Sequence, residues 1–371
     1  MNFHDRLAAI CRRMKEQKLD LLVGLHDGGH FIEKPNSVMV ISGFKSLGAA
    51  AVMLRPDGES RLVVAPSWDA ERAAECCPVA RVSGTDNVAE ELLTLIRREA
   101  LPTQSIGVAG LRALPSQIAV RIASALPDAQ FADAIVFDAA RTKTDEEIAN
   151  AREAAHIAER GYQRLIEITR PGMSEDELAS ELKLFMKSLG ADDNFLMLCA
   201  NPHNRAVQPS TGRRLQYGDI LLAEITPSVR GQLAQICRTV VLGLPPNELR
   251  HKYQLVVDAM NAGIAAAVPG TTMSAVCAAI NAVLEAQGYG EYCRPPHIRR
   301  RGHGLGFGSV RPGDVALDNM TVLEPDMLFM IHPNQYLPET GYLLCGEPVV
   351  MTANGAEPLT AKKASLAWVT A

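Results

Sequence analysis

The sequence of 371 residues lacks the features that mark several special classes of protein. No apolar run approaches the roughly 20 residues of a transmembrane helix. The start of the chain reads as an amphipathic helix without the apolar core of a secretory leader. With a net charge of −5, the chain has no general attraction to nucleic acid or to an anionic membrane. We therefore expect a cytoplasmic protein without nucleic-acid or membrane partners.

Metal-binding cysteine patterns are missing as well. The eight cysteines lie singly, apart from the adjacent Cys76 and Cys77, and none has the CxxC spacing of a zinc site. Aromatic residues make up only 5% of the chain, but 47% hydrophobic and 21% charged residues are an ordinary globular composition. We expect reduced thiols and an ample hydrophobic core.

The chain is long for one domain, and its pattern changes near residue 140. In residues 1–140, apolar runs alternate with amphipathic stretches, which predicts a small α/β domain without a glycine-rich phosphate loop. The Asp-Gly between two of the runs predicts a hairpin turn. We expect strands at 19–24, 37–42, 49–54, 61–66 and 105–110, and helices at 86–100 and 116–126.

Residues 141–371 alternate helix pairs with blocks of strands, which is an α+β pattern. Thr144 with Glu147 and Ser174 with Glu177 have the spacing of capping boxes that open two helices. Later helices are expected at 248–268 and 272–287, and later strands within 321–333 and 341–352.

The segment DILLAEITPSVRGQLAQICRTV (219–240) predicts a hairpin of two apolar strands. With Ser228 facing Gly231, Glu224 would lie opposite Gln235, their Cβ atoms about 5 Å apart. Alternation puts Glu224, Gln235 and Cys237 on one face. Two interpretations stay open: a Glu–Gln hydrogen bond inside the core, or a pair that shares a ligand or ion.

Two histidines lie in patterns that favour a functional site. His303 lies in RGHGLGFGSVRPG, where flanking glycines let the backbone approach a ligand closely. Arg311, in the same segment, either holds a substrate carboxylate or forms an exposed salt bridge. His332 ends an apolar strand just before Pro333, and Glu347 follows a short hairpin.

The order of motifs resembles the pita-bread fold family of creatinase, prolidase and methionine aminopeptidase. The segments that carry the resemblance span about 145–360 and are KTDEEIANAR, RPGMSEDEL, YGDILLAEI, QICRTVVLG, GHGLG and LEPDMLFMIHP. The resemblance implies a C-terminal pita-bread domain at 141–371 and a smaller α/β domain at 1–140. It also implies a homodimer in which one subunit's N-terminal domain helps to close the other's cleft.

The metal ligands that the resemblance implies are mostly replaced in this sequence. Metal-dependent relatives hold two divalent ions with two Asp, one His and two Glu. The matching positions here are Glu224, Gln235, His303, His332 and Gly346, or Glu347 with a shift of one residue. Two hard cations need several anionic oxygens, so we expect no dinuclear site and no cofactor.

Creatinase is a metal-free relative that cleaves a C–N bond with a histidine as acid and base. Our leading hypothesis is a similar metal-independent hydrolase of a small amino-acid-derived, amidine or amide substrate. His303 or His332 would transfer the proton, since an imidazole titrates near neutral pH. Glu224 would orient the histidine or bind a substrate cation, while Gln235, Arg311, His203 and Glu347 would position the substrate.

Three other hypotheses stay open. Glu224, His303 and His332 would suit one Fe, Mn or Zn ion in a mononuclear hydrolase or lyase. Another hypothesis is a binding protein that uses this fold without catalysis. Cys237 is a candidate nucleophile, although a buried cysteine is commonly a small hydrophobic side chain.

Overall fold

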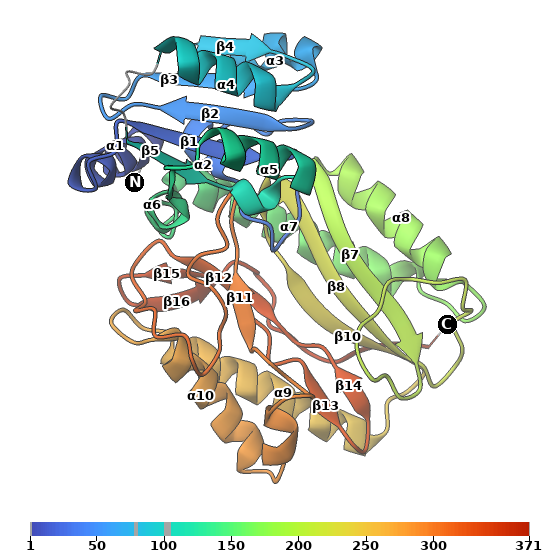
Figure 1. Cartoon of the computed structure of the whole chain (residues 1–371). Helices are drawn as coiled ribbons and strands as arrows, with labels where there is room; N and C mark the ends of the chain where they lie inside the picture. The colour runs from blue at the N-terminus through green and yellow to red at the C-terminus, as the bar shows by residue number, and fades with distance from the viewer. Residues whose placement is uncertain (1, 78–80, 100–104, 371) are drawn as a thin grey trace. The chain divides into compact units, whose positions relative to one another are not determined.

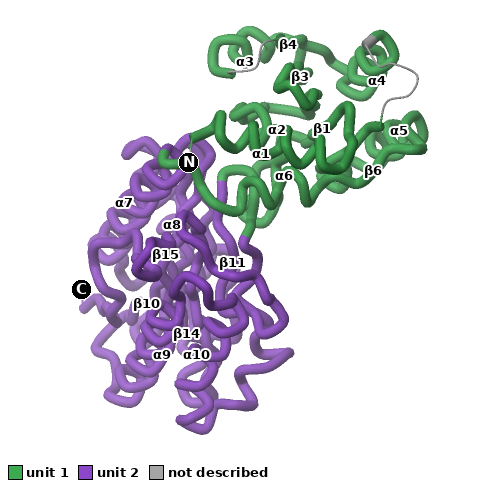
Figure 2. The backbone as a smooth tube through the Cα atoms, turned by 90° about the vertical axis from the view of Figure 1, so that its left-hand side faces the viewer, with its two compact units in different colours: residues 1–145, 307–311 green, residues 146–306, 312–371 purple. Residues whose placement is uncertain are grey.

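The computed structural model describes residues 2–77, 81–99 and 105–370. The chain forms two compact units, one of residues 1–145 with 307–311 and one of residues 146–306 with 312–371 (Figure 2). Within the described ranges, no helix is both long and apolar enough to cross a membrane.

The first unit is a mixed sheet with helices on both faces. Its strands lie in the order β4-β3-β2-β1-β5-β6. Because neighbouring side chains on a strand point to opposite faces, Leu22 and Val52 pack in one core with α1, α2 and α6. Leu21 and Val63 pack in a second core with α4 and α5. The elements are α1 Phe3–Glu16, β1 Leu21–His26, α2 Ser37–Ser42, β2 Ala50–Leu54, β3 Ser60–Val64, α3 Ala70–Cys76, β4 Arg81–Gly84, α4 Val88–Glu99, β5 Ile106–Ala109, α5 Ser116–Ala125, β6 Gln130–Phe131 and α6 Asp133–Ala139.

One predicted strand is wrong, because residues 37–42 form the helix α2. The β-branched run favoured a strand, but the residues that flank it cap a helix. The side chain of Asn36 accepts the Met39 N–H at the N-terminus, and Gly43 takes the left-handed conformation at the C-terminus. All six helical residues are buried, so no polar face marks the helical period.

The second unit contains two main sheets. The first has the strand order β17-β10-β8-β7, and the second has the order β11-β12-β15-β16. Helix α8 packs along β7, while α9, paired with α10, packs against β12 and β16 (Figure 1). The elements are α7 Asp145–Ile168, α8 Glu175–Ser188, β7 Asp193–Asn201, β8 Ile220–Val229, β9 Gln232–Leu233, β10 Ile236–Leu242, α9 Asn247–Ala266, α10 Met273–Glu285, β11 Gly302–Gly304, β12 Leu328–Ile331, β13 Gln335–Leu337, β14 Gly341–Leu343, β15 Glu347–Thr352, β16 Gly355–Pro358 and β17 Ala367–Val369.

The hairpin of β8 with β9 and β10 has a different register from the predicted one. Its two turn residues are Arg230 and Gly231, both with positive φ, as a type I′ turn requires. Glu224 therefore pairs with Cys237, and the predicted pairing with Gln235 is wrong. The turn lies one residue further along than we assumed, because the conformation needs glycine at its second position.

Pro227 interrupts the same hairpin. The Ala234 N–H donates to the Pro227 carbonyl at 3.2 Å, but proline has no N–H to return the bond. Between β9 and β10 the chain leaves the regular ladder at residues 234 and 235. The backbone of Gln235 therefore belongs to neither β9 nor β10. Its side chain lies in the site described below.

The two sheets meet where β10 passes residue 346. Cys237 and Gly346 exchange backbone hydrogen bonds of 3.2 and 3.1 Å. Beside this bridge, the Arg238 Nη1 donates to the Gly346 carbonyl at 2.6 Å. The Arg238 Nη2 donates to the Glu347 carboxylate at 2.6 Å. We call the Cys237–Gly346 bridge and the Arg238–Glu347 ion pair the seam.

Breaking the seam should destabilise the fold strongly. Both side chains of the ion pair are only 3% exposed, so Glu347→Leu leaves a buried guanidinium without its carboxylate. We expect a loss of roughly 3–5 kcal/mol in the free energy of unfolding, measured by urea denaturation. The double variant Arg238→Met/Glu347→Leu should recover much of that loss. Glu146→Gln, in the exposed pair with Arg230, should change it by less than about 1 kcal/mol; an equal loss in both pairs would contradict the argument.

Gly302 sets the approach of β11 to β12. Its φ is +152°, and a Cβ there would lie 1.9 Å from the Met330 carbonyl oxygen. Any side chain would push β11 away from its partner strand. The glycine before His303 is therefore needed to bring that histidine onto the sheet.

Gly302→Ala should cost roughly 3 kcal/mol in the free energy of unfolding, because the new methyl group meets fixed backbone. Gly172→Ala is the control. It also has a positive φ, +86°, but nothing lies within 4 Å of the added Cβ, so only about 1–2 kcal/mol should be lost. Equal losses in the two variants would show that the close contact with Met330 is unimportant.

Candidate active site in the second unit

A polar cluster lies on the inner face of β8 and β10. Glu224, which is partly exposed, accepts a hydrogen bond from the Asn334 side-chain amide at 3.3 Å. The Cys237 thiol lies opposite, 3.9 Å from the Glu224 Oε1 and 3.9 Å from the Asn334 Nδ2. The Cys345 N–H donates to Asn334 and fixes its amide. The Glu224 carboxylate thus lies between the Asn334 amide and the Cys237 thiol.

Cys237 has the properties of a buried thiol. Burial, and then the nearby Glu224 charge, raise its pKa well above the ordinary value. The side chain is fully buried and keeps its proton at neutral pH. A nucleophilic cysteine needs a lowered pKa and access to the substrate, so this environment does not favour Cys237 as a nucleophile.

His303 reaches the amide of Gln235. Its Nε2 lies 3.1 Å from the Gln235 Oε1, and its Nδ1 lies 3.1 Å from the Gly304 carbonyl oxygen. A carbonyl only accepts, so the Nδ1 carries a proton in this arrangement. The Gln235 oxygen likewise only accepts, so with the amide in this orientation the Nε2 also carries a proton, and it is the atom that can lose it. An amide can offer N–H to the neutral ring or oxygen to the charged ring, so Gln235 can pair with both states.

His332 lies beside His303, with ring centroids 5.1 Å apart and the planes at 61°. Burial, followed by the neighbouring His303, lowers the pKa of His332 well below its usual value, so the ring is neutral. Its Nδ1 is buried and has no hydrogen-bond partner among the residues that the structure describes. A Cβ on Gly346 would lie 2.5 Å from the Cβ of His332. Position 346 therefore faces the histidines and is small enough to admit the imidazole.

The donor set does not fit the two-metal centre that the family resemblance implies. The five positions supply one carboxylate, one amide, two imidazoles and a glycine, and two divalent cations need more anionic oxygen. The unpartnered His332 Nδ1 is the kind of atom a single ion could use. Across residues 2–77, 81–99 and 105–370, however, no group of three His, Cys, Asp or Glu side chains is arranged to hold a metal ion.

The other predicted site residues lie elsewhere. Glu347 is in the seam, on the opposite side of β15 from Gly346. Arg311 belongs to the first unit and pairs with Asp138 at 3.0 Å, which is the salt bridge we had considered as its alternative. His203 is exposed, with its Nε2 3.0 Å from the Pro338 carbonyl oxygen and its ring against Tyr336.

Two residues that support the site, Asn334 and Arg301, have no clear signal in the sequence. Asn334 follows His332 by two residues at a strand end, and an isolated amide there is a weak signal. Arg301 lies in the run Arg299-Arg300-Arg301, a pattern typical of a solvated face, but its side chain is 1% exposed. Its guanidinium donates to the Asn281 Oδ1 and to the Pro333 carbonyl, which fixes the turn directly after His332.

Comparison with known proteins agrees with the two units. Residues 6–143 match the Creatinase/Prolidase N-terminal domain, and residues 149–353 match Metallopeptidase family M24. An Xaa-Pro dipeptidase of Pyrococcus furiosus is 27% identical over 361 residues, covering 96% of this chain and 97% of the relative. An uncharacterised peptidase of Bacillus subtilis is 32% identical over 225 residues, covering 59% of this chain and 62% of the relative.

Solved structures share the fold at lower identity. The prolidase of Pyrococcus horikoshii matches with a TM-score of 0.84 and 22% identity, covering 97% of this chain and 99% of the other. An X-Pro aminopeptidase of Thermotoga maritima matches with a TM-score of 0.81 and 21% identity, covering 96% and 98%. The chain therefore belongs to metallopeptidase family M24, and carries the creatinase/prolidase N-terminal domain ahead of the pita-bread domain of that family.

Proposed function

We propose that this protein hydrolyses the C–N bond of a small amino-acid-derived amide, such as a dipeptide, with His303 as acid and base. Membership of a peptidase family supports the bond type, and the Xaa-Pro dipeptidase among its relatives supports a small peptide more than a creatine-like compound. The observation that carries the mechanism is the His303 ring held between the Gly304 carbonyl and the Gln235 amide.

In this mechanism the proton moves at the His303 Nε2. The neutral ring takes a proton from the attacking water while the Nδ1–H stays on Gly304 and fixes the ring plane. The proton then passes to the leaving nitrogen as the C–N bond breaks, so the ring returns to its neutral state. The Nε2 has one position for a partner, so Gln235 would move aside while the water and then the leaving nitrogen occupy it. In the resting site the Gln235 amide pairs with it again.

Two neighbours support this role. Glu224, a partly exposed carboxylate of the cluster, would bind the ammonium group of a peptide-like substrate. His332 is neutral and packs against His303 edge to face, so it adds no positive charge of its own beside the reacting ring. Both residues would bind and orient, while His303 would transfer the proton.

A second candidate is a mononuclear enzyme with one ion on Glu224, His303 and His332. It is favoured by the metallopeptidase family of the chain and by the unpartnered Nδ1 of His332. The ion would supply a Lewis acid for the scissile carbonyl. The described geometry does not assemble these three side chains as a ligand set, so we place this candidate second.

The test is a hydrolysis assay of purified full-length protein on Xaa-Pro dipeptides, other dipeptides and small guanidino compounds. His303→Gln should lower kcat/KM by roughly 10²–10⁴-fold, the usual contribution of a general acid–base. Gln235→Glu should move the acidic limb of the kcat/KM profile to higher pH, because a carboxylate stabilises the imidazolium and raises its pKa. His251→Gln, an exposed histidine of α9, should leave both unchanged.

Elemental analysis and assays in a strong chelator separate the two candidates. Full activity in the chelator supports the metal-free mechanism. Activity that disappears in the chelator and returns with one ion per chain would replace it by the mononuclear mechanism. No hydrolysis anywhere in the panel, together with saturable binding of a dipeptide, would instead favour a binding protein on this fold.

A further inference from the structure

Two tyrosines lie on the short strands that follow the site, Tyr336 on β13 and Tyr342 on β14. They are direct partners in the pairing of these strands. Directly paired residues of antiparallel strands point to the same face, with their Cβ atoms about 4.5–5.5 Å apart. Both side chains are half-buried, so part of each is accessible to a ligand.

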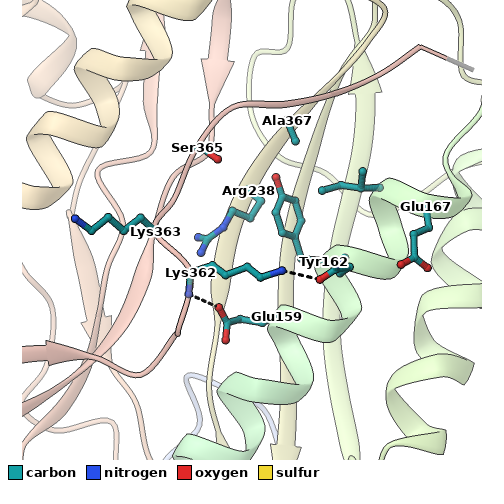
Figure 3. Close-up of a pocket in the computed structure, with 10 residues that line it drawn as sticks. Glu159, Tyr162, Glu167, Arg238, Lys362, Lys363, Ser365 and Ala367 are labelled. Atoms are coloured by element: carbon teal, nitrogen blue, oxygen red, sulfur yellow. Dashed lines mark hydrogen bonds between the residues drawn. The ribbon is translucent and has the colours of Figure 1, made fainter.

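The side chains of Cys345 and Glu347 show which face of this segment is turned away from the site. The Cys345 Sγ lies 3.6 Å from the Met260 Sδ of α9. Glu347 pairs with Arg238, which lies over the Tyr162 ring of α7, with 5.7 Å between the Arg238 Cζ and the ring centroid (Figure 3). The odd-numbered positions of the segment therefore face the helices.

The even-numbered positions face the site. A Cβ on Gly346 would lie 2.5 Å from the His332 Cβ, so position 346 is turned toward the histidines. Side chains alternate along an extended chain. Tyr342, four residues before Gly346, therefore lies on the same face.

The β13 side places Tyr336 on this face as well. Asn334 donates to Glu224 and so lies inside the site. The next side chain, Gln335, accepts from the buried Arg301 on the other side, and the alternation brings Tyr336 back to the face of Asn334. The two tyrosines therefore extend the site beyond Glu224, on the side away from the histidines.

A group of other rings holds the ring of Tyr336. His297 stacks on it, with ring centroids 5.8 Å apart and planes at 17°. Tyr292 lies 5.9 Å away, and His203 meets it edge to face at 5.8 Å. Aromatic residues make up only 5% of the chain, so this concentration beside the site is local. A ring that is fixed before binding loses less entropy when another ring packs on it.

The spacing from Glu224 to the tyrosines suits an aromatic amino acid. Asn334, which contacts Glu224, is separated from Tyr336 by roughly 7 Å, the rise of two strand residues. This is close to the reach from the ammonium nitrogen to the far part of the ring in a phenylalanine residue. Contacts between aromatic rings contribute more than the area that they bury, so a wall of tyrosines selects a ring over an aliphatic chain.

We infer, on the basis of the proposed role of Glu224 in binding the substrate ammonium, that Tyr336 and Tyr342 bind an aromatic side chain on the amino-terminal residue of the substrate. The preferred substrates are then dipeptides or amides whose first residue is phenylalanine, tyrosine or tryptophan. The two tyrosines determine specificity by binding, and they take no part in the proton transfer at His303.

The test uses three probes without a scissile bond, each titrated calorimetrically into the full-length protein. Phenethylamine carries the ammonium and the ring, cyclohexylethylamine has a saturated ring of similar size, and phenylethanol lacks the charge. Phenethylamine should bind saturably, roughly two- to tenfold more tightly than cyclohexylethylamine because of the ring contacts. It should bind at least roughly tenfold more tightly than phenylethanol, which cannot pair with a carboxylate.

Variants of the two tyrosines show whether their rings cause the preference. Tyr336→Leu/Tyr342→Leu should bind the two amines equally, because an aliphatic wall does not select a ring. Tyr336→Phe/Tyr342→Phe keeps both rings and should keep the preference. Tyr217→Leu, which changes an exposed tyrosine outside this group of rings, should behave as the unmodified protein does. The three probes decide the question in the unmodified protein even if a variant does not fold.

No saturable binding of phenethylamine, or equal binding of phenethylamine and either of the other probes, would overturn the inference. So would an unchanged preference in Tyr336→Leu/Tyr342→Leu. Hydrolysis separates the inference from the proposed function, since Phe-Pro should be cleaved with a lower KM than Ala-Pro. Equal KM values during normal turnover would contradict the aromatic site alone. Absent hydrolysis together with the expected binding of phenethylamine would contradict the hydrolase alone.

Discussion

The candidate site depends on the seam between the two sheets of the second unit. Cys237 brings the hairpin that carries Glu224, and Gly346 brings the strand that faces His332. Their backbone bridge is short, with one exchange of hydrogen bonds. The buried Arg238 and Glu347 side chains fix the direction of so short a bridge by hydrogen bonds to each other and to the Gly346 carbonyl, because satisfied polar groups in the interior hold their geometry tightly. The strand that carries Cys237 and the strand that follows Gly346 are thereby fixed to each other by groups outside the Glu224–His303 cluster.

The replaced family positions form a consistent set. A glutamate at position 346 would collide with the imidazole at 332, because even a Cβ there comes within 2.5 Å of the His332 Cβ. Glycine at 346 therefore leaves the space that histidine at 332 needs, so the two replacements depend on each other. Gln235 fits the same pattern. An aspartate could only accept from His303, which favours the charged ring, whereas an amide can pair with either protonation state. The replacements exchange a charge-dense centre for one based on neutral polar groups.

Much of this arrangement was predictable from sequence, because the fold's signals are local and repeated. Local signals are present for several elements. They are the capping residues Ser174 and Thr272, the Asp-Gly turn between β2 and β3, and the glycines around His303. The exceptions are informative. The helix at 37–42 depended on its caps, while all six of its residues are buried and show no helical period. The pairing of Glu224 with Cys237 depended on a turn that lies one residue later in the sequence than predicted. The positions of the Glu347, Arg311 and Arg301 side chains depend on partners far away in the sequence, and a local sequence pattern does not contain this information.

Pro227 has an effect well beyond its own position. An unbroken ladder would have held residue 235 flat in the sheet, with its side chain limited to the direction set by the pleat. The missing N–H opens one rung, and the strand can bend away there and rejoin at Ile236. A single absent hydrogen atom thus releases the backbone from the pleat next to the residue whose amide oxygen lies 3.1 Å from the His303 Nε2.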